Sequence, residues 1–67
     1  MIEVNVNGEA RRIAGGTTVA GLLDAMQLAG KRLAVERNGG IVPKSQHGTT
    51  SLHAGDKLEI VVAVGGG

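Results

Sequence analysis

The group with the clearest chemical potential in this sequence is the carboxylate of its last residue. Gly65, Gly66 and Gly67 directly follow an apolar run that ends at Val64. Glycine loses more conformational freedom on folding than any other residue, so three in a row add nothing to a folded core. A thread without side chains is narrow, and three residues span at most about 10 Å. The pattern predicts that the carboxylate of Gly67 reaches into a narrow site, although a frayed end without function would look the same.

The side chains that commonly perform catalysis do not form a convincing set. His47 and His53 lie in irregular sequence without an obvious third ligand, so we expect surface loop residues and no metal site. The segment 39–45 superficially matches the end of a P-loop, but Pro43 replaces the required glycine and lacks a backbone N–H. Serine, histidine and aspartate residues are present from which a catalytic triad could be drawn. So short a chain, however, lacks room for a substrate cleft beside its core. We therefore expect no catalytic residue in this chain.

Composition narrows the class of protein further. The 67 residues suffice for one domain near the lower size limit for unaided folding. Without Cys, Phe, Tyr or Trp, the chain has no thiol chemistry and must build its core from aliphatic residues. The net charge of +1, with both signs scattered, favours neither nucleic acid nor a membrane surface as partner. No signal peptide or transmembrane pattern is present, so we expect a cytoplasmic location.

Alternation of apolar and polar residues predicts strands near both ends of the chain. Residues 2–6 alternate, Asn7-Gly8 is a strong hairpin signal, and residues 9–13 return as a second strand. Residues 57–64 form a final strand that is apolar on both faces near its end. That pattern is typical of a central strand, or of a strand with one face that docks a partner. The first and last strands could pair in parallel, because a crossover lies between them.

One helix is predicted between these strands. Its apolar stripe consists of Val19, Leu22, Leu23 and Met26. Thr18 is a suitable N-cap, and Gly30 is placed to end the helix. Short strands follow at 33–36 and 41–42, and an irregular connection leads to a turn at 54–56. A helix packed across one face of a sheet is the simplest way to bury the stripe.

This order of elements and several short motifs resemble the ThiS family of sulfur carrier proteins. The motifs are Met1-Ile2, Asn7-Gly8, Thr18-Val19 with Leu22-Leu23, Ala34-Val35-Glu36, Asn38-Gly39, Ile41-Val42-Pro43, Gly55-Asp56-Lys57 and the terminal glycines. The family signature is a terminal glycine pair, so the third glycine, Gly65, departs from it. The resemblance implies an α+β, ubiquitin-like β-grasp fold, with about four to five strands in a mixed sheet and one main helix across one face. The β-grasp domain would cover 1–64, and a flexible glycine tail 65–67.

The resemblance also implies a function in which the chain is a co-substrate rather than an enzyme. In this family a ThiF-like, E1-like adenylyltransferase uses ATP and Mg²⁺ to adenylate the terminal carboxylate, which then becomes a thiocarboxylate. The thiocarboxylate donates sulfur to a ThiG-like thiazole synthase in thiamine biosynthesis, and a cysteine desulfurase system supplies the sulfur. Gly67 would carry the sulfur, Gly65 and Gly66 would thread the tail, and no cofactor would be bound by the chain itself. Adenylation is needed because a carboxylate is a poor electrophile with a poor leaving group.

The end of the last strand is a candidate surface for docking these partners. Val61, Ala63 and Val64 would form an apolar patch beside the tail if they are exposed, and core packing is the alternative. Charged residues nearby, such as Glu59 or Arg37, could tune the choice of partner.

Two other kinds of function stay open. One is a different carrier of the same fold, either a MoaD-like sulfur carrier for molybdopterin or a ubiquitin-like protein modifier. MoaD-like chains are typically longer and have an aromatic and proline stretch before the glycines, where this chain has Val62-Ala63-Val64. The second alternative is a non-catalytic β-grasp interaction module, which predicts a basic face and needs no free C-terminus.

Overall fold

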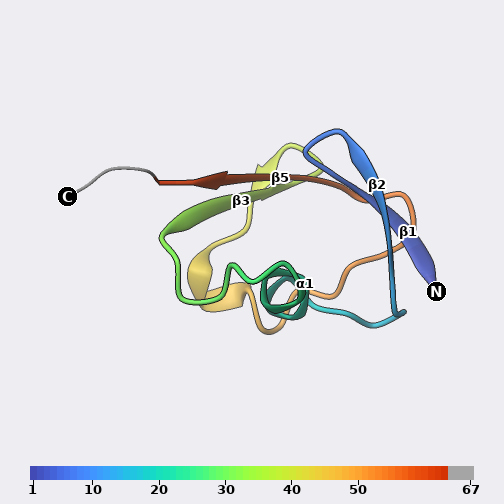
Figure 1. Cartoon of the computed structure of the whole chain (residues 1–67), viewed down its shortest axis with the longest axis horizontal. Coiled ribbons are helices and arrows are strands. Elements are labelled where there is room, and N and C mark those ends of the chain that lie inside the picture. Colours follow the sequence, from blue (N-terminus) through green and yellow to red (C-terminus); the bar gives the residue numbers. More distant parts are fainter. Residues whose placement is uncertain (64–67) are drawn as a thin grey trace.

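The first and last strands meet at the centre of a five-stranded sheet with the order β2-β1-β5-β3-β4 (Figure 1). The computed structural model describes residues 1–63. β1 (Ile2–Val6) and β5 (Lys57–Val62) pair in parallel, with Val6 opposite Leu58. Parallel strands need a long crossover, which the helix and the segments after it provide. The predicted mixed sheet and the parallel pairing of its first and last strands are confirmed.

Two asparagine-glycine turns form the hairpins of the sheet. β1 pairs antiparallel with β2 (Glu9–Ile13), and β3 (Leu33–Arg37) pairs antiparallel with β4 (Gly40–Ile41). At the first turn Asn7 and Gly8 have φ angles of 53° and 88°, and at the second the pair 38–39 has 52° and 86°. A two-residue hairpin loop of this type needs positive φ at both positions, which asparagine and glycine tolerate best.

Helix α1 (Val19–Ala25) begins at the predicted residue and ends earlier than predicted. Thr18 caps it, because its Oγ1 accepts a hydrogen bond from the Gly21 N–H at 3.1 Å. The prediction that Gly30 ends the helix is wrong. Gln27 takes the left-handed conformation with φ of 61°, and the Leu28 N–H donates to the Leu23 carbonyl at 2.8 Å. This arrangement ends the helix with the left-handed residue that is usually a glycine, and glutamine is seldom found in that position.

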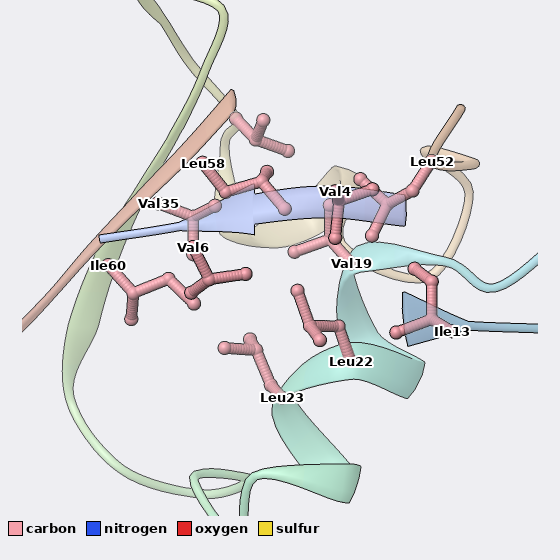
Figure 2. Packing of buried hydrophobic residues seen from close by; sticks show 11 residues of the cluster. Val4, Val6, Ile13, Val19, Leu22, Leu23, Val35, Leu52, Leu58 and Ile60 are labelled. Carbon is pink, nitrogen blue, oxygen red and sulfur yellow. The ribbon is translucent and has the colours of Figure 1, made fainter. Parts of the chain in front are cut away.

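The core lies between α1 and the face of the sheet that it covers (Figure 2). Three of the four residues in the predicted stripe are buried, and Met26 is partly buried against them. The connection after β4 includes a short 3-10 helix, η1 (Lys44–Gln46). The same connection places Leu52 in the core, where 2% of its surface is exposed. The buried apolar residues are Val4, Val6, Ile13, Val19, Leu22, Leu23, Val35, Val42, Leu52, Leu58 and Ile60.

The final strand and the fourth strand differ slightly from their predicted bounds. β5 ends at Val62 rather than at residue 64, and β4 covers Gly40–Ile41 rather than 41–42. Val64 and the glycines 65–67 lie outside the described residues, so the division into a domain and a tail stays a prediction. No helix in the described part of the chain is both long and apolar enough to cross a membrane.

Candidate functional site

The C-terminal end of β5 is the candidate functional site, because the glycines follow it. β3 pairs with β5 along its whole length, from Arg37 opposite Leu58 to Leu33 opposite Val62. The Ala63 N–H then donates to the Arg32 carbonyl at 2.9 Å. In Figure 1, β5 runs toward the side of the molecule opposite the N-terminus. Strand pairing therefore fixes the position of the chain up to Ala63, two residues before the first glycine of the predicted tail.

On its other side β5 is held by β1 for only part of its length. The parallel pairing with β1 stops at Leu58, and the side chain of Asn7 then bonds to the backbone of Ile60. The last part of β5 therefore lies beside β3 alone among the described strands. The predicted roles of Val64, Gly65, Gly66 and Gly67 lie outside the described residues and stay predictions.

The face of the sheet turned away from α1 carries an exposed apolar patch at this end. Val61 has 64% of its surface exposed, and Ala63 is also exposed. Ala34 lies directly opposite Val61 on β3 and is exposed too. The alternative that Val61 packs in the core is wrong, because its neighbours Ile60 and Val62 turn toward α1 instead. We call Ala34, Glu36, Glu59, Val61 and Ala63 the outer sheet surface. Its role in docking stays a prediction.

A pair of carboxylates adjoins this apolar patch. Glu36 and Glu59 lie directly opposite each other on β3 and β5. Like charges at opposed positions of an antiparallel pair destabilise the sheet. Neither carboxylate has an ion-pair partner within residues 1–63, where Arg37 and Asp56 form the one salt bridge. The outer sheet surface is therefore apolar near the tail and acidic farther from it.

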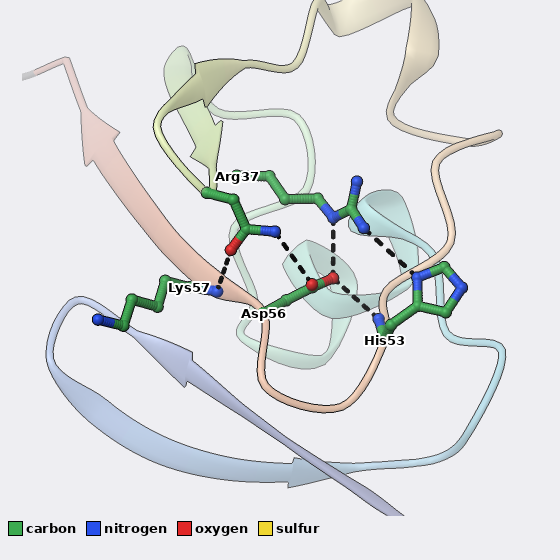
Figure 3. Close-up of polar contacts among 5 residues, drawn as sticks. Arg37, His53, Asp56 and Lys57 are labelled. Carbon is green, nitrogen blue, oxygen red and sulfur yellow. Dashed lines mark hydrogen bonds and ion pairs between the residues drawn. The ribbon is translucent and has the colours of Figure 1, made fainter.

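Arg37 does not belong to this surface, contrary to the prediction. Because it lies opposite the buried Leu58, it shares the inner face of the sheet. Its Nε donates to Asp56 Oδ2 at 2.8 Å (Figure 3). Arg37 is the last residue of β3 and lies at the opposite end of that strand from Leu33, which pairs with Val62. Of the two charged residues predicted to tune the choice of partner, Glu59 alone belongs to the outer sheet surface.

Among residues 1–63, Asp56 is the buried polar or charged residue, and the sequence pattern assigned it only to a turn. It has 6% of its surface exposed and accepts hydrogen bonds from Arg37, from Asn38 Nδ2 at 3.1 Å and from the His53 N–H at 2.9 Å. Asn38 Oδ1 in turn accepts from the Lys57 N–H at 2.9 Å. These bonds connect the β3–β4 turn to the first residue of β5 (Figure 3). No local sequence signal distinguished this aspartate from an ordinary turn residue.

The same contacts set the protonation of Asp56. Burial alone would raise the pKa of its carboxyl group. The hydrogen bonds from Arg37, the His53 backbone and Asn38, with the charge of Arg37, outweigh burial and hold the pKa below its ordinary value. Asp56 is therefore an ionised anchor for the start of β5, far along the strand from the predicted tail.

The two histidines have different surroundings. His53 is exposed, and its Nδ1 lies 3.4 Å from Nη2 of Arg37. His47 is half-buried, with Nε2 3.1 Å from the Val42 carbonyl. Within residues 1–63 no three histidine, cysteine or acidic side chains lie close enough together to hold a metal ion. Neither histidine lies at the end of β5, and both belong to loop contacts.

The chain is similar in sequence to thiazole synthases and in structure to a ThiS protein. It is 45% identical over 62 residues to a thiazole synthase of Paramagnetospirillum magneticum, and 36% identical over 66 residues to one of Magnetococcus marinus. These matches cover 92% and 98% of this chain but only 19% and 20% of the relatives, so it spans about a fifth of their length. The crystal structure of the thiamine biosynthesis protein ThiS from Geobacter metallireducens superposes with a TM-score of 0.83 at 29% identity, covering 98% of this chain and 100% of that one.

The model of one protein family matches the chain up to its last residue. The model of the ThiS family matches residues 4–67, which include β5 and the three glycines. Both the predicted family and the predicted β-grasp architecture are confirmed. The chain therefore belongs to the ThiS family.

Proposed function

We propose that this chain is a sulfur carrier of thiamine biosynthesis and that the carboxylate of Gly67 carries the sulfur. The observation that carries the proposal is the family match over residues 4–67, which includes the glycines after β5. The strand pairing up to Ala63 supports it, because a rigid domain would present whatever follows at a fixed place. The chain acts as a co-substrate, and its partners supply the catalytic groups.

The proposed chemistry converts a poor electrophile into a sulfur donor in two steps. A carboxylate oxygen of Gly67 attacks the α-phosphate of ATP, and pyrophosphate leaves. A sulfide equivalent then attacks the acyl carbon, so that a C–S bond forms as the bond to AMP breaks. The resulting thiocarboxylate is a nucleophile that can attack a carbonyl or imine carbon. An E1-like adenylyltransferase with ATP and Mg²⁺ would perform the first step in the cytoplasm. A cysteine desulfurase system would supply the sulfur as a persulfide, and a thiol reductant would release it at the oxidation level of sulfide.

Thiazole synthase is the proposed acceptor of the sulfur. The two curated relatives bear that name, and this chain matches about a fifth of each. If a carrier domain and a thiazole synthase domain are parts of one polypeptide in those relatives, the two domains would act on each other. The outer sheet surface is the proposed docking area for the adenylyltransferase, since Val61 and Ala63 adjoin the start of the tail. Exposed apolar residues beside a functional group commonly mark a binding surface.

The intact mass of the chain tests this proposal. After incubation with ATP, Mg²⁺ and a sulfur source in extract from its own host, we expect the mass gain of one oxygen replaced by sulfur, localised to Gly67. Gly66→Val should show no gain, because a side chain blocks a narrow channel. Gly15→Val is the matched control, since a Cβ at Gly15 meets no atom within 4 Å. An unchanged wild-type mass, where a control carrier is charged, contradicts the proposal, and charging of Gly66→Val contradicts the threading argument.

The charged chain then separates thiamine biosynthesis from the other carrier functions. Adding it to purified thiazole synthase together with the carbonyl substrate of that enzyme should return the original mass, because the sulfur passes to the substrate carbon and water restores the carboxylate. Transfer to molybdopterin synthesis, or formation of isopeptide bonds to lysines, would instead support one of the alternative carriers.

A further inference from the structure

A groove lies on the helix side of the molecule, away from the outer sheet surface. It runs between the loop after α1 and the η1 helix, which Figure 1 shows side by side below the sheet. Its cavity volume is about 210 Å³, and it continues past His47 toward Gly48. Leu23, Leu28 and Leu33 contribute apolar surface to its lining. We call this feature the helix-side groove. It is large enough for an aliphatic side chain, and the core does not fill it.

Cations surround this apolar lining. Lys31, Arg32 and Lys44 contribute to the groove, and all three are exposed. None of them forms a salt bridge within the described part of the chain, and no acidic residue lines the groove. His47 lines it as well, and the bond between its Nε2 and the Val42 carbonyl fixes the ring. An apolar pocket bordered by cations fits an aliphatic side chain that is followed or preceded by a carboxylate.

The groove adjoins the strand that leads to the predicted tail. Arg32 lines the groove, and its backbone carbonyl accepts the hydrogen bond of the Ala63 N–H at 2.9 Å. Any protein that receives the tail would therefore come close to the groove. The outer sheet surface on the other face carries the opposite charge, because Glu36 and Glu59 lie there. Opposite charges on two faces allow a partner to accept the domain in one orientation only.

We propose that the helix-side groove docks a surface segment of thiazole synthase in which an aliphatic side chain lies next to a carboxylate. The choice of synthase rests on the proposed function, whereas the chemistry of the segment rests on the lining of the groove. The aliphatic side chain contacts Leu23, Leu28 and Leu33, and the carboxylate binds Lys31 or Lys44. A free inorganic anion would use the cations but leave the apolar lining empty.

Charge reversal of single lysines tests the groove. We would titrate the chain, with an unmodified carboxylate at Gly67, against thiazole synthase from the same host in a calorimeter. The Kd should be about tenfold higher for Lys44→Glu and for Lys31→Glu than for wild type. Arg11→Glu is the matched control, because it makes the same charge change at an exposed residue on β2, outside the groove. Its Kd should stay within about twofold of wild type. Amide NMR spectra of each variant establish that it remains folded.

Each result decides for or against the groove. Equal Kd values for the two lysine variants and Arg11→Glu would overturn the proposal, as would the absence of binding by wild type. Binding of the adenylyltransferase or of inorganic phosphate at these lysines, with binding of the synthase unaffected, would also overturn it. The test does not depend on whether Gly67 receives sulfur. If Gly67 forms the thiocarboxylate but the lysine variants bind the synthase as wild type does, this inference alone is refuted. A chain that uses the groove but is never charged refutes the proposed chemistry alone.

Discussion

The side-chain amide of Asn7 forms two hydrogen bonds with the backbone of Ile60. Asn7 Nδ2 donates to the Ile60 carbonyl at 3.1 Å, and the Ile60 N–H donates to Asn7 Oδ1 at 2.8 Å. The Asn7 N–H also donates to the Leu58 carbonyl at 2.9 Å. The side chain thereby takes the place of the peptide group that a longer β1 would provide. It extends the support of β5 toward the predicted tail without lengthening the hairpin.

Replacing Asn7 by glycine should weaken β5 at this place. Gly keeps the positive φ of 53° without strain but removes both side-chain bonds, so we expect a loss of about 1–2 kcal/mol in the free energy of unfolding. Urea denaturation measures the loss, and hydrogen exchange locates it. The Ile60 amide should exchange faster, whereas the Ala63 amide, which bonds to Arg32 on the β3 side, is the internal control. An unchanged Ile60 rate would show that these bonds contribute nothing.

Replacing Asp56 by asparagine should destabilise the whole fold. The change removes the charge that Arg37 faces and leaves buried donors without a full set of acceptors. We expect a loss of about 1–3 kcal/mol, since Arg37 is partly exposed and water compensates in part. Asp24→Asn is the control, because Asp24 is exposed on α1 and forms no salt bridge within residues 1–63. Equal urea midpoints for the two variants would contradict the structural role of Asp56.

Stability should also fall in acid because of Asp56. Its pKa is lower in the folded chain than in the unfolded one, so the unfolded state binds the proton more readily. The contribution is complete above about pH 5 and disappears as pH falls through the ordinary aspartate pKa of about 3.9 to the lower folded value. Urea midpoints at a series of pH values measure it. Asp56→Asn should lose this part of the pH dependence, and a variant curve parallel to wild type would refute the assignment.

Replacing Val61 by glutamate should impair docking without unfolding the domain. Val61 has 64% of its surface exposed, so the charge stays solvated in the free chain. In a complex it would be buried against a partner and beside Glu59, so we expect the rate of charging by the adenylyltransferase to fall about tenfold. Ala25→Glu is the control, because Ala25 is exposed on α1, which covers the opposite face of the sheet. Equal charging rates for both variants would place docking elsewhere.

Local features of the sequence predicted most of the fold. Both asparagine-glycine turns form as expected because positive φ is a property of two adjacent residues and needs no distant partner. The helix starts at Val19, directly after its N-cap Thr18, because a cap forms within one turn. The end of the helix differs from the prediction because Gln27 takes a positive φ, for which glutamine has no special preference. The hydrogen bond from the Leu28 N–H to the Leu23 carbonyl accompanies this conformation.

The sequence by itself determined the family, the strand alternation and the glycine-rich end, because each of these follows from residue type and spacing along the chain. Only the tertiary structure decided that Val61 is exposed, that Asp56 is bound by Arg37, and that cations of the loop after α1 meet Lys44 at one groove. These relationships join segments far apart in sequence. They depend on the register of β3 against β5 and on the path of the crossover, which are set when the sheet and the helix pack together.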